Sequence, residues 1–410
     1  MLPRLQTLWL TLGLALTIGP TRAAEPTPPE TPPSDPPVEL TPEELKAIEE
    51  SLGAPTPSAP APASPAFLQS MNPDMSLVLD VTGAWFSKEE PLQLGGHDPA
   101  RTGFTFQQLE LHASANVDPF FRLDANIVFA EVGVEVEEAF ATTLALPAGL
   151  QMRVGQFLTR FGKRNPTHPH QWGFLDQPLV LGKFFGSESA RGLGLELSWL
   201  TPLPWYVEVI AAAQGAAGEC CARSFYGGLD AGVRGPEDLR YTLAVKQFFD
   251  LSRDWAFQWG LSAMLGPNGT GHGNRTGIYG TDLFLRWKPT GSAGRQSVDL
   301  LLELMLRARE VPGDSLVDWG LFAELRWQID AEWALGLRHD AVGGVEDDPL
   351  DPAWTGLAQR TALAVDLWPS HFSRLRLQGG LALADWQEAP GGFVMLGLEV
   401  AIGAHGAHAY

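Results

Sequence analysis

The sequence predicts an all-β fold, a transmembrane up-and-down antiparallel β-barrel of about sixteen strands. Three observations predict it. Apolar and polar residues alternate along most segments of 71–410, the connections between segments alternate between short and long, and aromatic residues gather near segment ends. Because the segments 138–146 and 203–213 alternate weakly, the expected strand count lies between about fourteen and eighteen.

The alternation of residue character is clearest between 319 and 329. Trp319, Leu321 and Leu325 occupy one set of alternate positions, whereas Glu324 and Arg326 occupy the other. The same pattern recurs at 121–129, 298–307 and 374–383. Successive side chains of a strand point to opposite faces. Each segment is therefore expected to turn an apolar face to lipid and a polar face to the lumen of the barrel.

Connection length also alternates along the chain. The even-numbered connections are short and fall at 118–119, 146–149, 201–204, 250–254, 330–331 and 369–370. Most odd-numbered connections are long and fall at 87–102, 162–190, 214–238, 266–277 and 341–356. Outer-membrane barrels combine short periplasmic turns with longer outer loops. A soluble β-sandwich has no reason to sort its loops in this way.

The N-terminal residues 1–24 are predicted to be a secretory signal peptide. Arg4 precedes an apolar run at 8–18, and small residues at 21–24 suit cleavage. The run is too short for a membrane-spanning helix, which needs about 20 residues. The signal and the barrel pattern together predict the outer membrane of a Gram-negative cell, with the N-terminus of the mature chain in the periplasm.

Residues 25–70 are predicted to be a Pro-rich, acidic periplasmic tether that precedes a barrel domain at 71–410. Such a composition cannot bury a core and favours extended conformations. One short helix is expected within it at 41–53, because Thr41, Pro42 and Glu44 form a helix start and Gly53 a helix end. This helix is interpreted either as a solvated patch of the tether or as a periplasmic docking element.

The overall composition argues against nucleic acid as a partner, and it leaves open whether the two cysteines form a disulfide. The formal net charge is −20 and the isoelectric point is about 4.8, a balance that argues against binding to nucleic acid. The two cysteines, Cys220 and Cys221, are adjacent. An exported chain meets an oxidising environment, so they are expected to form either a vicinal disulfide or two free thiols, and their spacing matches no zinc motif.

Residues on the polar face of the segments are candidates for lining a channel. They include acidic and basic side chains in nearly equal number, so the wall of the lumen is expected to be almost neutral. Barrels of sixteen strands leave an aqueous channel, which favours a water-filled lumen; the alternative is that these ions pair across neighbouring strands and fill the interior. The candidates are Arg122, Asp124, Arg153, Asp299, Glu303, Arg307, Glu324, Arg326, Arg374 and Arg376.

The longest connection, 162–190, is expected to fold inward and constrict the channel. It is the third of the outer connections, and its prolines and aromatic residues favour a compact loop. Its candidate constriction residues are Lys163, Arg164, His168, His170 and Asp176. The alternative is a surface loop that lies outside the barrel.

A family resemblance rests on the stretch 154–162, which reads VGQFLTRFG. It resembles the G-x-F-x-x-x-F-G strand end of the phosphate-selective porins O and P; in general porins the third outer loop folds inward and narrows the pore. The resemblance implies a sixteen-stranded diffusion channel that assembles as a homotrimer. Those porins select anions with pore-lining lysines, of which this chain has few. The chain is also similar to a set labelled zinc-regulated TonB-dependent outer-membrane receptors, although such receptors need about 22 strands around a plug.

Two short motifs suggest other chemistry. His168 and His170, and likewise His405 and His408, are pairs that can bind zinc. Because no cysteine or third histidine stands at ligand spacing, no structural or catalytic metal site is predicted, and loose affinity for divalent ions is favoured over one. The triplet 112–114, His-Ala-Ser, resembles the His-x-Ser pair of outer-membrane phospholipases. Its parity places it on the lumen face, whereas those enzymes present the pair to lipid. The chain is therefore predicted not to be an enzyme and to need no cofactor.

The sequence thus predicts a porin-like channel for passive diffusion of small hydrophilic solutes or ions, constricted by 162–190. Two alternatives remain: an uptake channel with preference for a metal ion or chelate, and a structural or adhesive barrel. The expected partners are outer-membrane lipid, the barrel assembly machinery, the solute and, in a homotrimer, further copies of the chain.

Overall fold

The computed structural model describes residues 73–403, except 132, 230, 293–294, 347 and 349–350. The predicted signal peptide, the tether 25–70 with its helix at 41–53, and the histidines at 405 and 408 lie outside the described residues. The first strand begins at Asp74.

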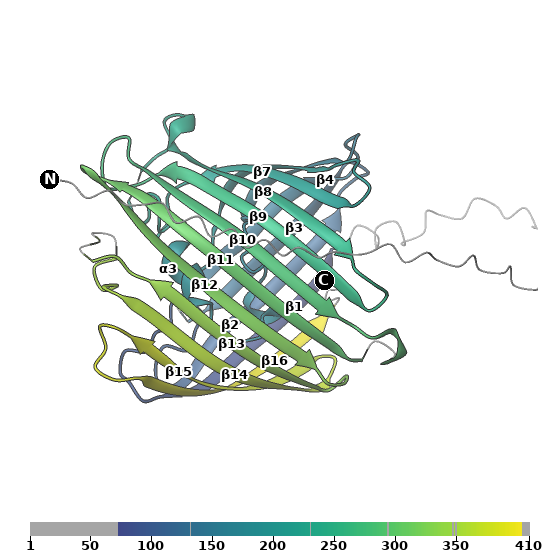
Figure 1. Cartoon of the computed structure of the whole chain (residues 1–410). Helices are drawn as coiled ribbons and strands as arrows, with labels where there is room; N and C mark the ends of the chain where they lie inside the picture. Colours follow the sequence, from purple (N-terminus) through teal and green to yellow (C-terminus); the bar gives the residue numbers. More distant parts are fainter. Residues whose placement is uncertain are drawn as a thin grey trace, which may run out of the picture. The chain divides into compact units, whose positions relative to one another are not determined.

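Sixteen strands form one closed barrel in which each strand is antiparallel to both neighbours (Figure 1). Neighbours in sequence are neighbours in space, and β1 closes the barrel against β16, where Ser76 pairs with Gly403 and Phe86 with Phe393. This confirms the predicted fold class and fixes the strand count. The strands are β1 (Asp74–Phe86), β2 (Gly103–Asn116), β3 (Phe121–Ala130), β4 (Gly133–Thr143), β5 (Leu150–Leu158), β6 (Arg191–Leu200), β7 (Tyr206–Gly215), β8 (Leu239–Asp250), β9 (Trp255–Pro267), β10 (Arg275–Trp287), β11 (Ser297–Val311), β12 (Asp314–Gln328), β13 (Trp333–Gly343), β14 (Leu357–Ser370), β15 (Ser373–Ala384) and β16 (Gly391–Gly403).

Among the described residues, four short helical elements lie in the connections. They are η1 (Pro169–Gln171), α3 (Leu179–Phe184), η2 (Pro236–Asp238) and η3 (Thr290–Ser292). Both η1 and α3 belong to the long connection between β5 and β6, and α3 contacts β12 and β13. In the part of the chain that the structure describes, no helix is long and apolar enough to cross a membrane.

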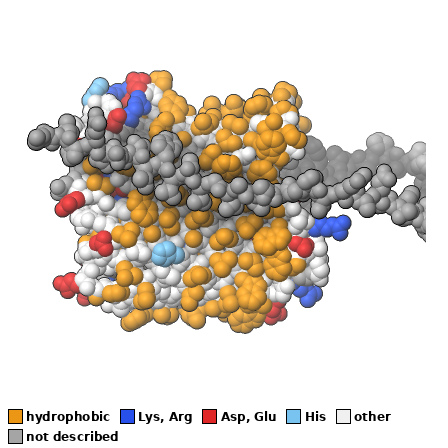
Figure 2. Space-filling model, viewed as in Figure 1, with side chains coloured by type: hydrophobic (Ala, Val, Ile, Leu, Met, Phe, Trp, Pro, Cys, Tyr) orange, Lys and Arg blue, Asp and Glu red, His pale blue; other side chains and the backbone are white. Residues whose placement is uncertain are grey.

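Burial follows the alternation expected of the strands. On β12, Phe322 and Glu324 are 0% and 7% exposed, whereas Leu325 and Trp327 are 41% and 45% exposed. Hydrophobic side chains cover the outer surface of the strands in the view of Figure 2. The outward-facing residues are therefore mostly apolar and the charged residues face inward, which is the arrangement a bilayer requires; apolar residues such as Phe322 also face inward, where they are buried.

The connections sort by length onto the two ends of the barrel, with exceptions. The short-turn end carries 117–120, 144–149, 201–205, 251–254, 288–296, 329–332 and 371–372. The opposite end, called here the long-connection end, carries 87–102, 131–132, 159–190, 216–238, 268–274, 312–313, 344–356 and 385–390. The predicted tight turns are confirmed, and two of them are built by aspartates: Asp118 accepts from the backbone N–H of Phe121 and Asp330 from that of Trp333. Which side of the membrane each end faces remains a prediction.

A β-bulge interrupts the pairing of β3 with β4. Asn126 pairs with Glu138 and Ile127 with Val136, so Glu137 is the extra residue. A bulge places two successive residues against one partner and re-aims a side chain. As a result Glu137 and Glu138 are both buried, at 5% and 7% exposure, although strict alternation would separate them.

Candidate functional site

Residues 159–190, called here the internal segment, leave β5 and enter the barrel. Gly162 lies at the entry with φ +60°, and a Cβ there would come within 2.4 Å of Oε2 of Glu303. Only glycine adopts this conformation without strain and leaves room for the carboxylate. The backbone N–H of Gly162 donates to Oγ of Ser262, and Nζ of Lys246 donates to its carbonyl oxygen over 2.7 Å. The VGQFLTRFG stretch therefore ends at the turn into the lumen.

An apolar core joins the internal segment to the wall. Leu179, Val180 and Phe184 of α3 are all 0% exposed. They belong to one cluster with side chains from the strands and from the connections 216–238 and 344–356. Burial of such side chains contributes about 1.5–3 kcal/mol each. The wall members are Met264, Ile278, Phe284, Leu301, Met305, Phe322, Val342, Ala358 and Ala384.

Buried ion pairs hold the same segment to β13, β14 and β15. Asp176 is fully buried, and its carboxylate lies 2.6 Å from Nη2 of Arg338 and 2.9 Å from Nη1 of Arg360. The Nε2 amide of Gln378 donates to the same carboxylate over 2.7 Å. Burial works against the charged form, but the two guanidinium groups lower the pKa of Asp176. One acidic side chain is thus shared by three strands.

Further pairs complete the attachment. Nη2 of Arg164 lies 2.6 Å from Oε2 of Glu324, and the backbone N–H groups of Lys163 and Arg164 donate to Oε1 of Glu303. Nζ of Lys183 lies 2.8 Å from Asp318, which also binds Arg307. The internal segment therefore reaches strands on several sides of the lumen.

The guanidinium groups of β15 bind the segment through its backbone. Arg374 donates to the carbonyl oxygen of His170, and Nη2 of Arg376 donates to that of Trp172 over 2.8 Å. These guanidinium groups satisfy two buried backbone carbonyls in and just after η1.

The predicted lining residues divide into two groups. Those near the short-turn end keep some solvent exposure: the side chains of Arg122, Arg153 and Arg326 are 46%, 17% and 19% exposed. Their ion pairs lie within the wall, between Arg122 and Asp124, Arg153 and Glu196, Arg286 and Asp299, and Arg326 and Asp366. We call this region the polar vestibule.

The second group lies against the internal segment and is buried. Glu303, Arg307, Glu324, Arg374 and Arg376 belong to it, all below 9% exposure. In this part of the barrel, the internal segment and its ion pairs to the wall occupy part of the interior and narrow it. The water-filled channel stays a prediction.

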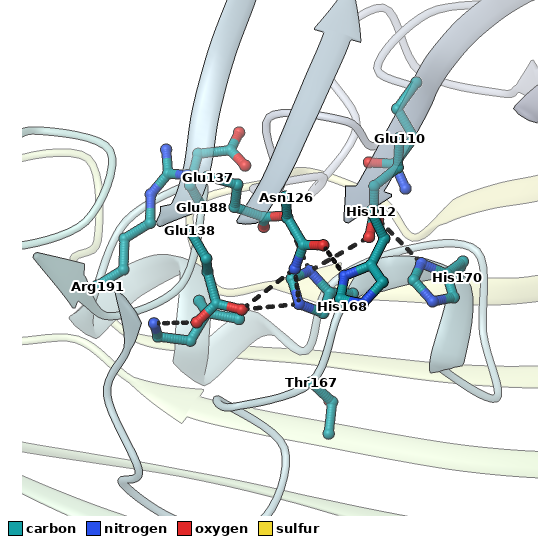
Figure 3. A network of polar contacts seen from close by, with 12 residues as sticks. Glu110, His112, Asn126, Glu137, Glu138, Thr167, His168, His170, Glu188 and Arg191 are labelled. Atoms are coloured by element: carbon teal, nitrogen blue, oxygen red, sulfur yellow. Dashed lines mark hydrogen bonds and ion pairs between the residues drawn. The ribbon is translucent and has the colours of Figure 1, made fainter. Parts of the chain in front are cut away.

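A cluster of histidines and glutamates lies where the internal segment meets β2 and β4 (Figure 3). Nδ1 of His168 is 2.8 Å from Oε2 of Glu137, and its Nε2 is 3.0 Å from Oε2 of Glu138. Nδ1 of His170 is 3.0 Å from Oε2 of Glu110. Burial disfavours the imidazolium form, but the Glu137 and Glu110 carboxylates raise the pKa of His168 well above its usual value.

The sequence did not identify several residues of these contacts. Glu137 and Glu138 were missed because the bulge in β4 breaks the alternation that assigns the lumen face. Asp318, Asp340 and Arg309 have lumen parity but lie near the long-connection ends of their strands, where the sequence assignment stopped. No local pattern predicts that Glu110 and His170, sixty positions apart, are neighbours.

Cys220 and Cys221 form a vicinal disulfide in the connection between β7 and β8. Of the two expectations from the sequence, the structure therefore has the disulfide. Nε of Arg191 lies 3.2 Å from Sγ of Cys221, and Arg240 donates to the Cys221 carbonyl oxygen over 2.8 Å. These contacts join the connection to β6 and β8.

Comparison with known proteins identifies the fold. No protein-family profile matches the chain. An uncharacterized protein of Aquifex aeolicus (strain VF5) is 29% identical over 413 residues, covering 88% of this chain and 84% of the relative. Among solved structures, OprB of Pseudomonas putida matches with a TM-score of 0.58 at 10% identity, covering 82% of this chain and 96% of that chain.

Two further structures match in the same way. The outer membrane channel DcaP of Acinetobacter baumannii has a TM-score of 0.53 at 10% identity, covering 80% of this chain and 97% of that one. An anion-selective porin from Comamonas acidovorans has a TM-score of 0.51 at 11% identity, covering 80% and 99%. The chain has the fold of outer-membrane porins. The finer resemblance to the phosphate-selective porins O and P stays a prediction.

Proposed function

We propose that this protein is an outer-membrane channel for passive diffusion of small hydrophilic solutes, and that the internal segment sets the width of its open path. The observation that carries the proposal is the combination of a closed sixteen-stranded barrel with a segment anchored inside it. A barrel of this size without an internal segment would leave a wide aqueous channel.

The outer surface supports placement in a membrane. Leucines and tryptophans such as Leu325, Trp327 and Leu377 are 41–50% exposed on the strands. A soluble protein rarely exposes a contiguous apolar patch of more than a few hundred Å², whereas a barrel in lipid needs an apolar band on its outer face.

The polar vestibule supports passage of hydrophilic solutes. Its charged side chains form opposite-charge pairs within the wall, so a solute that enters meets alternating positive and negative groups. Lys163 lies at the boundary with the internal segment, where its Nζ is 2.8 Å from Oε1 of Gln258 and 4.2 Å from the ring centroid of Phe284. Because the charges are paired, we propose no strong selectivity for anions or cations.

The test is a planar-bilayer recording on the refolded full chain and on a variant that lacks residues 167–180. The wild type is expected to conduct in steps, and the deletion to raise the single-channel conductance. A matched control removes 388–390 from the exposed β15–β16 connection, which should leave the conductance unchanged. Unchanged conductance in the 167–180 deletion would place the constriction elsewhere.

The same recordings separate the competing functions. A structural or adhesive barrel would show no conductance steps in any variant. A reversal potential in a salt gradient reports charge selectivity, for which we expect a value near zero. Chemical cross-linking of the refolded protein tests the homotrimer that the porin resemblance implies.

A further inference from the structure

We propose that Glu110, Glu137 and His168 bind one divalent transition-metal ion of the zinc class at the contact between the internal segment and the wall. The site goes beyond the proposed channel function and does not depend on it. It joins three parts of the chain: β2 supplies Glu110, the bulge of β4 supplies Glu137, and the internal segment supplies His168 (Figure 3).

The ligand atoms are already close to the spacing a metal ion needs. One carboxylate oxygen of each glutamate and one ring nitrogen of His168 all lie within 4.8 Å of one another. Nδ1 of His168 is 2.8 Å from Oε2 of Glu137 and 3.9 Å from Oε1 of Glu110. Zinc binds such atoms at about 2.0–2.2 Å, so tetrahedral ligands lie about 3.4 Å apart, between these two values. Small side-chain movements are therefore enough to admit an ion.

A second set of side chains orients these ligands. Nε2 of His168, which faces away from Glu137, lies 3.0 Å from Oε2 of Glu138. Glu138 is fixed in turn by the backbone N–H of Leu158, which donates to its Oε1 over 2.6 Å. Metal-bound histidines almost always donate their other ring N–H to a carboxylate or carbonyl. His170 has the same relation to Glu110, because its Nδ1 lies 3.0 Å from Oε2 and leaves Oε1 for an ion.

The charges around the cluster favour a cation. Among the described residues, the ion pairs of Glu110, Glu137 and Glu138 are with histidines alone, and none is with lysine or arginine. Three buried carboxylates against two imidazoles leave an excess of negative charge. A divalent ion would offset this excess, and buried charges are stable only when balanced.

A second acidic cluster shows the contrast. Asp318, Asp348 and Asp351 also lie close enough to hold an ion. Their carboxylates, however, pair with Lys183, Arg223, Arg307 and Arg309. These cations already neutralise the aspartates, and the cluster has no imidazole, so we assign no metal to it.

Two hollows border the cluster. One is lined by Asp80, His97, His170 and Glu399, among others, and the other by Glu137, Thr167 and Glu188, among others. His170 and Glu137 each form part of the wall of one hollow. A bound ion would link the internal segment to β2 and β4.

The choice of zinc follows from the ligand types. Imidazole nitrogen with carboxylate oxygen suits zinc and neighbouring transition metals, whereas magnesium and calcium prefer ligand sets made wholly of oxygen. We therefore expect magnesium to compete poorly. The experiment uses isothermal titration of zinc chloride and of magnesium chloride into the full chain, refolded in detergent.

The variants that carry the test are Glu137→Gln and His168→Gln, each in a background of H405Q and H408Q. That background removes the histidine pair outside the described residues, and by itself should keep one tight zinc per chain. Each site variant should weaken zinc binding about tenfold or more, and Glu138→Gln by about 10–100-fold. His272→Gln in the connection 268–274 is the matched control and should bind as its background does.

Two results would overturn the proposal: no zinc bound by the H405Q/H408Q protein, or equal affinity in the background and both site variants. If the site variants do not refold, zinc-edge X-ray absorption on the H405Q/H408Q protein tests the proposal by reporting which atoms bind the zinc. We expect nitrogen and oxygen ligands that include imidazole. A shell without imidazole, or one with sulfur, would contradict the site.

Discussion

Arg338 of β13 donates two hydrogen bonds to Asp176 of the internal segment, one to the carboxylate over 2.6 Å and one to the backbone carbonyl oxygen over 2.8 Å. The second carboxylate oxygen of Asp176 lies 2.9 Å from Arg360 of β14. This buried aspartate therefore holds the middle of the internal segment against β13 and β14.

Replacing Asp176 by asparagine should destabilise the barrel and release this part of the segment. The substitution keeps the shape but removes one of the two carboxylates that face Arg338 and Arg360, and leaves both guanidinium groups to share Asp340. Breaking a buried ion pair costs about 3–5 kcal/mol. We expect the urea midpoint of unfolding, followed by the heat-dependent shift in gel mobility, to fall. Glu388→Gln, in an exposed turn, serves as the control and should not change it. A D176N protein as stable as the wild type would show that the pair does not hold the segment.

His97 should contribute stability that depends on pH. Its Nε2 lies 3.1 Å from Oε2 of Glu188, and its Nδ1 lies 2.9 Å from the carbonyl oxygen of Gln107. Burial opposes the charged ring, but the hydrogen bond and charge of Glu188 raise the pKa of His97 to about 9. A raised pKa stabilises the folded state fully below about pH 6.5, and this contribution is lost as pH rises through about 9.

The measurement compares thermal unfolding of the wild type and of His97→Gln at pH 6 and pH 10. The unfolding temperature of the wild type should exceed that of the variant by more at pH 6 than at pH 10. At pH 6 the His97 ring is protonated in both the folded and the unfolded chain, so the contact with Glu188 contributes in full. Using the difference between the two proteins removes other groups that titrate over the same range. The same difference at both pH values would exclude a charged contact between His97 and Glu188.

The outer face should tolerate charge poorly. Leu304 lies in the middle of β11, is 45% exposed and faces outward. Arginine there should cost about 2–4 kcal/mol near the bilayer midplane. Gln328→Arg, on the inner face near the end of β12, is the control and should cost little. Refolding into lipid vesicles followed by urea titration gives the free energy of unfolding of both variants. Equal destabilisation at the two sites would contradict the assignment of Leu304 to the lipid-facing side of the barrel.

Residues 25–70 should not be needed to form the barrel. Their Pro-rich composition favours extended, solvated chain, and β1 completes its pairing with β16 from Ser76 onward. A chain with the signal peptide joined directly to Pro73 should assemble in the outer membrane and conduct. Heat-modifiable mobility and a bilayer recording report the two properties. Failure of this chain to assemble, while the full chain does, would show that the segment contributes to the barrel itself.

The inner and outer faces of the strands could be predicted because the information is local. Side chains alternate along a strand by covalent geometry, and lipid selects apolar residues for one face. Arg326 and Trp327 are adjacent, yet their opposite faces follow from the sequence alone. The short turns were equally local, since residues such as Asp118 and Asp330 satisfy backbone groups within three positions.

The site could be predicted only in part. His168, His170 and Asp176 were singled out from one connection, but their partners come from strands far away in sequence. Glu137 was not predicted to face the lumen, because one extra residue in β4 changes which residues of that strand point inward. A bulge depends on how two strands pair, and a single segment carries little trace of it.

The sequence by itself determined the barrel, its approximate strand number, the lipid-facing surface and the unusual connection at 162–190, because each depends on residue order within a short stretch. Only the tertiary structure decided that this connection lies inside the lumen, that Asp176 meets Arg338 and Arg360, and that Glu110 and Glu137 meet His168. The physical reason is that buried charges must find their counter-charges wherever the closed barrel brings them, and closure of the barrel is a property of all sixteen strands together.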